Sequence, residues 1–193
     1  MGHGREFHGI GRCTKAVIPY MRKARQGRVI AISSVGGLIG QPFNEIYCAS
    51  KFAVEGYIEG LASYVGPAFG LHFTAVEPGG ISSEFANSAL KQIEDTGGML
   101  QDEYLPILQK YLGSRTGRTD GIYQTSDEVA RVVIGCATSD RPPVRCRTSK
   151  WSEDFTKLKT AADPDGKKGA SDGCGTNAGR ALGFNATVCG FAA

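Results

Sequence analysis

A tyrosine and a lysine one helical turn apart are the residues of this chain best suited to acid–base chemistry. Tyr47 and Lys51 stand four positions apart, so on a helix both side chains lie on one face. A nearby cation favours the phenolate form of a tyrosine, whose ordinary pKa of about 10 otherwise makes it a poor proton carrier at neutral pH. Ser34, thirteen residues before Tyr47, has a hydroxyl that can hold a carbonyl or alkoxide oxygen. The three residues therefore predict a proton-transfer site.

Two predicted strands and a helix would position these side chains. Residues 27–34 form an apolar, β-branched run that ends in serines, and residues 72–77 form a second run that ends in Pro78-Gly79-Gly80. Helices are expected over residues 47–65 and 11–23. Because helices and strands alternate, we expect a parallel sheet, and ligands of such sheets bind at the carboxyl ends of the strands.

The later elements are predicted from capping and strand patterns. Ser126 is the expected N-cap of a helix that runs through Ile134, since acidic residues follow it in the first turn. Residues 143–148 form a last strand, which brings the expected sheet to about three strands. Residues 83–124 look irregular, and their apolar side chains either shape a hydrophobic pocket or pack against one another.

These motifs together resemble the short-chain dehydrogenase/reductase family, and residues 36–44 are most similar to its 17β-hydroxysteroid and retinol dehydrogenase branch. In that family a strand ending in Ser-Ser is followed thirteen residues later by Tyr-x-x-x-Lys and then by a strand ending in Pro-Gly. Here Ser34, Tyr47, Lys51, Pro78 and Gly79 occupy those positions. The resemblance covers residues 9 to 160 and implies the C-terminal part of a Rossmann-like, doubly wound α/β fold.

The resemblance also implies a role for each matching residue. Tyr47 would be the general acid/base, Lys51 would bind the nicotinamide ribose of NAD or NADP, and Ser34 would orient the substrate oxygen. The implied cofactor-binding residues are Tyr47, Lys51, Pro78, Gly79, Gly80, Ile81 and Ser83, the last in place of the family's common threonine. The implied reaction is hydride transfer between the cofactor and an alcohol or carbonyl on an apolar small molecule.

Two family features are missing from the sequence. It contains neither the strand and Thr-Gly-x-x-x-Gly-x-Gly turn that bind pyrophosphate nor the family's Asn-Asn-Ala-Gly, so the first three βα units, about 90 residues, are expected to be absent. Glu6 stands where the family has a relay asparagine, and an ionised glutamate offers no hydrogen-bond donor. Two interpretations stay open: a dehydrogenase, or a truncated, inactive relative that acts at most as a dimerisation partner.

Composition and cysteine spacing argue against several other classes. A net charge of +3 is too small to indicate a nucleic-acid partner, and no apolar run approaches the ~18 residues that span a membrane. The six cysteines include no Cys-x-x-Cys pair, and the three histidines complete no ligand set. We therefore expect a cytoplasmic protein with reduced cysteines and without a metal.

The chain divides by composition into two parts. Residues 1–165 are expected to form a partial catalytic domain, with a substrate lid over residues 83–125. Residues 166–193 are rich in glycine and alanine without an apolar period, which is typical of a flexible or aberrant tail. Because the helices that pair in dimers of the family are retained, and the strand that ends at Ser33 would lack a neighbour, a homo-oligomer is expected.

Overall fold

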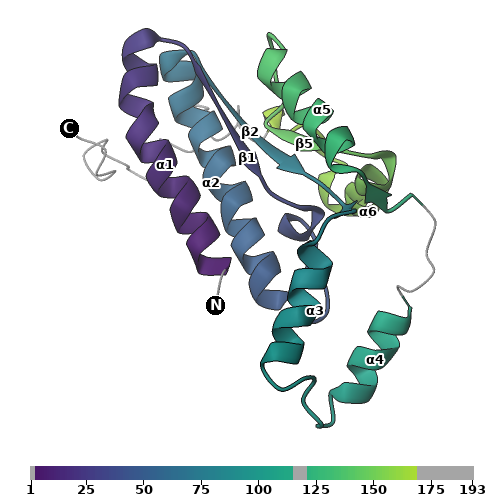
Figure 1. Ribbon diagram of the computed structural model, residues 1–193. Helices are drawn as coiled ribbons and strands as arrows, with labels where there is room; N and C mark the ends of the chain where they lie inside the picture. The colour runs from purple at the N-terminus through teal and green to yellow at the C-terminus, as the bar shows by residue number, and fades with distance from the viewer. Residues whose placement is uncertain (1–2, 115–120, 169–193) are drawn as a thin grey trace, which may run out of the picture.

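A three-stranded parallel sheet forms the centre of the molecule in the computed structural model, which describes residues 3–114 and 121–168 (Figure 1). The strands lie in the order β1-β2-β5, and their bounds are Gly27–Ile32, Leu71–Glu77 and Arg145–Arg147. The predicted α/β class and the parallel sheet of about three strands are confirmed.

Strands β1 and β2 end at the same edge of the sheet. They pair in register from Gly27 opposite Leu71 to Ile32 opposite Val76. Beyond the last pair, the Ser33 backbone N–H donates to the Val76 carbonyl at 2.7 Å, and the Val35 N–H donates to the Pro78 carbonyl at 3.0 Å. The two loops that leave this edge are therefore held together by backbone hydrogen bonds.

Helices α1 (His3–Ala24) and α2 (Glu45–Phe69) pack against each other on one face of the sheet (Figure 1). Both are longer than the predicted helices, because the packing of an apolar face extends a helix beyond what local propensity alone supports. Helix α2 runs past Pro67 and ends at Gly70, whose φ of 71° is a left-handed conformation that glycine adopts without strain.

The hydrophobic core lies between these two helices and the sheet. Its buried members come from α1, β1, α2, β2 and the segment before β5: Ile18, Ala31, Val54, Ile58, Leu61, Val65, Leu71, Phe73, Ala75 and Val144. The three members from β2, Leu71, Phe73 and Ala75, alternate along the strand, so one face of β2 is turned toward the helices.

The opposite face of the sheet carries α5 (Ser126–Thr138) and α6 (Lys150–Thr160) (Figure 1). The predicted N-cap of α5 was wrong by one residue. Thr125 is the N-cap, and it forms a capping box in which its side chain accepts from the Glu128 N–H while the Glu128 carboxylate accepts from the Thr125 N–H. At the other end of α5, Arg28 of β1 donates to the carbonyls of Cys136 and Ser139.

Within residues 83–124, where the sequence pattern is irregular, the structure describes two helices. Helices α3 (Phe85–Asp95) and α4 (Leu105–Gly113) project away from the sheet (Figure 1), and Gly97 and Gly98 turn the chain after α3 with φ of 103° and 83°. Short strands β3 (Gly80–Ile81) and β4 (Tyr123–Gln124) pair in parallel as a second sheet. The glycines that suggested irregularity mark a turn between two helices.

Strand β1 is an edge strand in the part of the chain that the structure describes, since only β2 pairs with it there. Ile32, its last residue, is 44% exposed. The predicted exposed edge thus has a structural counterpart. The predicted tail lies mostly outside the described residues, and the division at residue 165 stays a prediction.

Candidate active site

Ser34 sits at the carboxyl end of β1 and begins a short 3₁₀ helix, η1 (Val35–Gly37). Its backbone is extended, with φ of −168° and ψ of 159°, and its side-chain Oγ accepts a hydrogen bond from the Gly36 N–H at 3.0 Å. Because the hydroxyl acts as an acceptor in this N-cap contact, its own proton can be donated to another oxygen. Ser34 is almost wholly buried, so such a bond would form away from bulk water.

Gly36 separates the Ser34 hydroxyl from the ring of Tyr47. A methyl group built on Gly36 would lie 3.2 Å from Tyr47 Cε1 and 3.4 Å from Ser34 Oγ. Both side chains therefore approach the same backbone atom, one from β1 and the other from the first turn of α2. The absence of a side chain at this position is what allows the two polar groups to share a site.

Lys51 follows Tyr47 by one turn of α2, as the spacing predicted. Its Nζ lies 5.6 Å from the centroid of the Tyr47 ring and donates to the backbone carbonyl of Ile32 at 3.2 Å. Only 7% of Lys51 is exposed. A buried ammonium at this distance stabilises negative charge on the phenol, because charges interact strongly where water is excluded.

Pro78 is the first residue of the segment that the resemblance implies binds the cofactor, and it lies beside this site. The residues that follow it lead away from the site. Pro78 is buried and accepts from Val35, as described above. Gly79 packs against α6, where an added methyl would lie 3.0 Å from Ser152 Oγ and from Trp151 Cε3. Ile81 pairs with Gln124 in the second sheet, and Ser83 is exposed.

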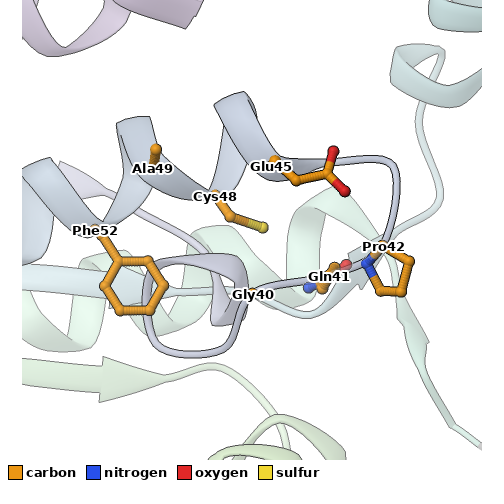
Figure 2. Close-up of a pocket in the computed structure, with 7 residues that line it drawn as sticks. All are labelled: Gly40, Gln41, Pro42, Glu45, Cys48, Ala49 and Phe52. Carbon is orange, nitrogen blue, oxygen red and sulfur yellow. The ribbon is translucent and has the colours of Figure 1, made fainter.

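A cavity of about 460 Å³ opens at the start of α2 (Figure 2). Its lining residues are Gly40, Gln41, Pro42, Glu45, Cys48, Ala49 and Phe52. Cys48 lies between Tyr47 and this cavity and is buried, which agrees with its predicted packing role.

The apolar side chains of residues 83–124 contribute nothing to that cavity, and α4 buries none of its residues. The ring of Tyr111 in α4 lies 5.6 Å from the ring of Phe43, in the loop before α2. The two alternatives for this segment, a hydrophobic pocket or the packing of its own helices, stay predictions.

Sequence reasoning missed a charged cluster beneath the site. Glu77, the last residue of β2, is fully buried, and Glu55 of α2 is 7% exposed. Arg147 Nη1 of β5 lies 3.4 Å from Glu77 Oε2. Burial, and then the charge of Glu55, raise the pKa of Glu77 to about 8, and burial also raises the pKa of Glu55. The only hint in the sequence was the glutamate that ends the apolar run of β2.

Two classes of site are not found in the part of the chain that is described. Within residues 3–114 and 121–168, no three histidine, cysteine or acidic side chains gather as a metal site would require. The helices of the same ranges include none whose length and apolar content suit a membrane span.

A parallel sheet with helices on both faces, and polar side chains gathered where its strands end, defines a Rossmann-like ligand-binding domain. A family model described as short chain dehydrogenase matches residues 5–94. The chain belongs to the short-chain dehydrogenase/reductase family, on the side of its retinol and hydroxysteroid dehydrogenases.

Two curated relatives illustrate this placement. Retinol dehydrogenase 8 of Bos taurus is 37% identical over 169 residues, which cover 83% of this chain and 51% of the relative. The 17-beta-hydroxysteroid dehydrogenase type 1 of Homo sapiens is 34% identical over 158 residues, which cover 82% of this chain and 48% of the relative. The chain thus spans about half the length of the curated relatives it matches.

Solved structures agree with the fold. A short-chain dehydrogenase from Streptomyces avermitilis superposes with a TM-score of 0.60 at 25% identity, covering 80% of this chain and 54% of that one. ElxO, solved with NADP bound, superposes with a TM-score of 0.51 at 26% identity, covering 72% of this chain and 52% of that one.

Proposed function

We propose that this chain carries the proton-transfer site of an NAD(P)-dependent oxidoreductase, which interconverts an alcohol and a carbonyl on an apolar small molecule. The observation that carries the proposal is the meeting of Ser34 and Tyr47 at Gly36, with the Lys51 ammonium 5.6 Å from the tyrosine ring. Membership of a dehydrogenase family supports the same chemistry.

Each side chain has a distinct role in this proposal. Ser34 donates a hydrogen bond to the reacting oxygen and so orients it. Tyr47 gives its phenolic proton to that oxygen during reduction and takes a proton from it during oxidation. Lys51 stabilises the phenolate that forms and, through its bond to Ile32, keeps the first turns of α2 fixed against the end of β1.

A nicotinamide nucleotide, when bound, would supply or accept the hydride. The residues present fit the nicotinamide end of such a cofactor. An ammonium group has three donors, one of which Lys51 places on Ile32, and Pro78 and Gly79 lie at the adjoining strand end. The binding of NADP by ElxO supports this cofactor class. The sequence shows no comparable residues for the pyrophosphate, because it contains no Thr-Gly-x-x-x-Gly-x-Gly turn after a strand.

A second candidate function follows from the half-length match to the relatives. In this alternative the chain is an inactive fragment that acts at most by pairing with a complete subunit. Hydride transfer needs a cofactor held in reactive geometry. The chain matches only 51% of retinol dehydrogenase 8, and this half-length match favours the alternative.

The decisive experiment joins this chain to the amino-terminal half of human retinol dehydrogenase 8, a relative 36% identical over 163 residues. Oxidation of NADH or NADPH with apolar carbonyl substrates is then measured for the chimera and for its Tyr47→Phe variant. We expect turnover by the chimera and none by the variant. A chimera that binds cofactor but turns over no substrate would instead favour the inactive fragment.

The isolated chain provides the complementary measurement. Titration with NADH and NADPH, followed by nucleotide fluorescence, should give little or no binding, since the pyrophosphate has no cradle. Binding in the low micromolar range would contradict this part of the proposal.

We also propose that the chain forms homo-oligomers through α1 and α2. Their outward surface is supported as an interface by its exposed apolar side chains, among them Tyr20 at 77% and Phe52 at 44% exposure. Open space at Gly56 and Gly60 would let a second helix approach closely. A cytoplasmic location belongs to the same proposal, with support from the free thiols at Cys13, Cys48, Cys136 and Cys146.

A further inference from the structure

Four polar side chains meet in the interior directly below the proposed active site. Ser33 and Glu77 come from the ends of two neighbouring strands, Glu55 from α2 and Arg147 from β5. Glu77 is fully buried, Ser33 and Glu55 are 3% and 7% exposed, and the Arg147 side chain is 8% exposed. Such a group is costly to bury unless its charges and hydrogen bonds balance.

Among the described residues, direct ion pairing reaches only one of the two acids. The Arg147 guanidinium contacts Glu77 Oε2 at 3.4 Å, whereas Arg145 is paired with Asp163 at 3.3 Å. Of the two buried carboxylates, Glu77 is therefore the one with a guanidinium in direct contact. A carboxylate without its own cation in such a place tends to bind a proton.

The oxygen atoms of the two acids point to where this proton lies. Glu55 and Glu77 lie close enough that each affects the pKa of the other. Among the described residues, however, neither Glu55 Oε1 nor Glu77 Oε1 has a donor. One proton held between the two carboxyl groups satisfies both atoms, as in other pairs of carboxyl groups that share a site. The Ser33 hydroxyl faces Glu55, although no described group completes a well-directed bond with it.

Three members of the cluster adjoin a residue of the proposed active site. Ser33 precedes Ser34, Glu77 precedes Pro78, and Glu55 lies one turn after Lys51. Gly37 packs closely against three of these residues. A methyl added to it would lie 2.8 Å from Ser33 Oγ and 3.0 Å from both Glu55 Cγ and the Lys51 carbonyl. The space around Gly37 has no room for a side chain, so a shift of Glu55 moves η1 or α2.

We propose that Glu55 and Glu77 form a buried acid pair that holds one shared proton and thereby positions Ser34 and Lys51. Loss of the proton leaves two adjacent carboxylates beside one guanidinium, and their repulsion separates α2 from the end of β2. The pair is a positioning device, because it acts through the neighbouring residues Ser33 and Pro78 and through α2. Its importance for catalysis rests on the proposed function, while the shared proton itself does not.

The other ionisable groups around the pair set the conditions of the test. They are Glu59 on α2, Arg145, Cys146 and Arg147 on β5, and Cys136 on α5. Lys51, one turn before Glu55, donates to the Ile32 carbonyl. Burial raises the pKa of Cys146 to about 12, and therefore this thiol stays neutral throughout the range of the experiment. Arginine is also charged throughout that range.

Infrared spectroscopy of the full chain tests the shared proton directly. At pH 7 exposed carboxyl groups are ionised, so a carbonyl stretch from a protonated carboxyl group reports only groups whose pKa is raised. We expect this band in the wild type at pH 7, its loss by pH 10, and its absence at pH 7 from Glu55→Gln. Absence of the band from the wild type at pH 7 would overturn the proposal without any variant being needed.

Trp151 reports whether the proton positions the strand end. It is the single tryptophan of the chain, and it packs against Gly79, two residues after Glu77. We expect its fluorescence to change with a midpoint near pH 8 in the wild type and in the control Glu153→Gln, an exposed acid two residues from the reporter. Glu55→Gln and Glu77→Gln should each abolish the change, since either substitution leaves a single carboxylate, which the Arg147 guanidinium can balance without a proton. Persistence of the transition in either variant would refute the pair.

These readouts need neither cofactor nor substrate. An inactive chimera in which the band and the transition are both present would count against the proposed function and leave the acid pair intact.

Discussion

The Lys51 ammonium group donates a hydrogen bond to the backbone carbonyl of Ile32 at 3.2 Å. This contact joins the second turn of α2 to the last residue of β1, directly before the serines. A lysine assigned by resemblance to cofactor binding therefore also fixes the geometry of the site in the protein alone. Its two roles can be separated from that of Tyr47 by experiment.

Tyr47→Phe and Lys51→Ala should differ in three measurements on the chimera. Tyr47→Phe removes only the phenolic proton, so turnover should be lost while cofactor affinity and stability change little. Lys51→Ala should weaken cofactor binding as well and lower the free energy of unfolding by about 2 kcal/mol, because it removes a buried, charged hydrogen bond. Fluorescence titration and urea unfolding measure these effects, with the exposed Lys23→Ala as the control. Equal loss of cofactor binding in both variants would show that the two roles are misassigned.

Gly36→Ala tests the shared approach of Tyr47 and Ser34. The new methyl would stand 3.2 Å and 3.4 Å from their atoms, closer than ordinary contact, so one of the side chains must shift. We expect kcat of the chimera to fall roughly tenfold, which corresponds to about 1.4 kcal/mol in the activation free energy. Gly40→Ala is the matched control, since nothing lies within 4 Å of its added methyl. Equal kcat values for the two variants would place Tyr47 and Ser34 outside a common site.

The stability of the isolated chain should fall as the pH rises from the mildly acidic range to about 8. The pKa of Glu77 is about 8 in the folded protein against 4.5 for an ordinary glutamate, so between these values the folded state binds more protons than the unfolded state. The free energy of unfolding then decreases with pH, by at most about 1.4 kcal/mol per pH unit, and levels off above the folded pKa. Urea unfolding from pH 5 to 9 measures the slope, which Glu77→Gln should flatten. A stability that rises over this range would contradict the raised pKa.

Light scattering after size exclusion should show self-association at micromolar concentration. If the α1–α2 surface is the interface, Phe52→Glu will shift the chain toward monomer because it places a charge among apolar contacts. Ile134→Glu is the control, since Ile134 is 59% exposed on α5, on the other face of the sheet. Larger aggregates that persist in Phe52→Glu but disappear in Ile32→Lys would assign the association to the open edge of β1. A stable monodisperse wild-type monomer would contradict both surfaces.

The features that the sequence determined by itself are those that depend on local spacing. Four residues separate Tyr47 from Lys51, and any helix over them brings the two side chains to one face. The β-branched runs before Ser34 and Pro78 form strands wherever they are buried, which sufficed to predict a parallel sheet with polar residues at its edge. The first residues of helices were less well predicted, as at Thr125, because two adjacent hydroxyl residues can each serve as an N-cap.

Tertiary structure alone decided the features that join distant parts of the chain. Glu77 and Arg147 stand 70 residues apart, and nothing in the local pattern of either strand indicates that they meet in the interior beside Glu55. The role of Gly36 as the spacer between Ser34 and Tyr47 likewise appears only when η1 packs against α2. Hydrophobic periodicity specifies which face of an element is buried, but packing in three dimensions determines which buried groups become neighbours, and the pKa values in this core follow from those neighbours.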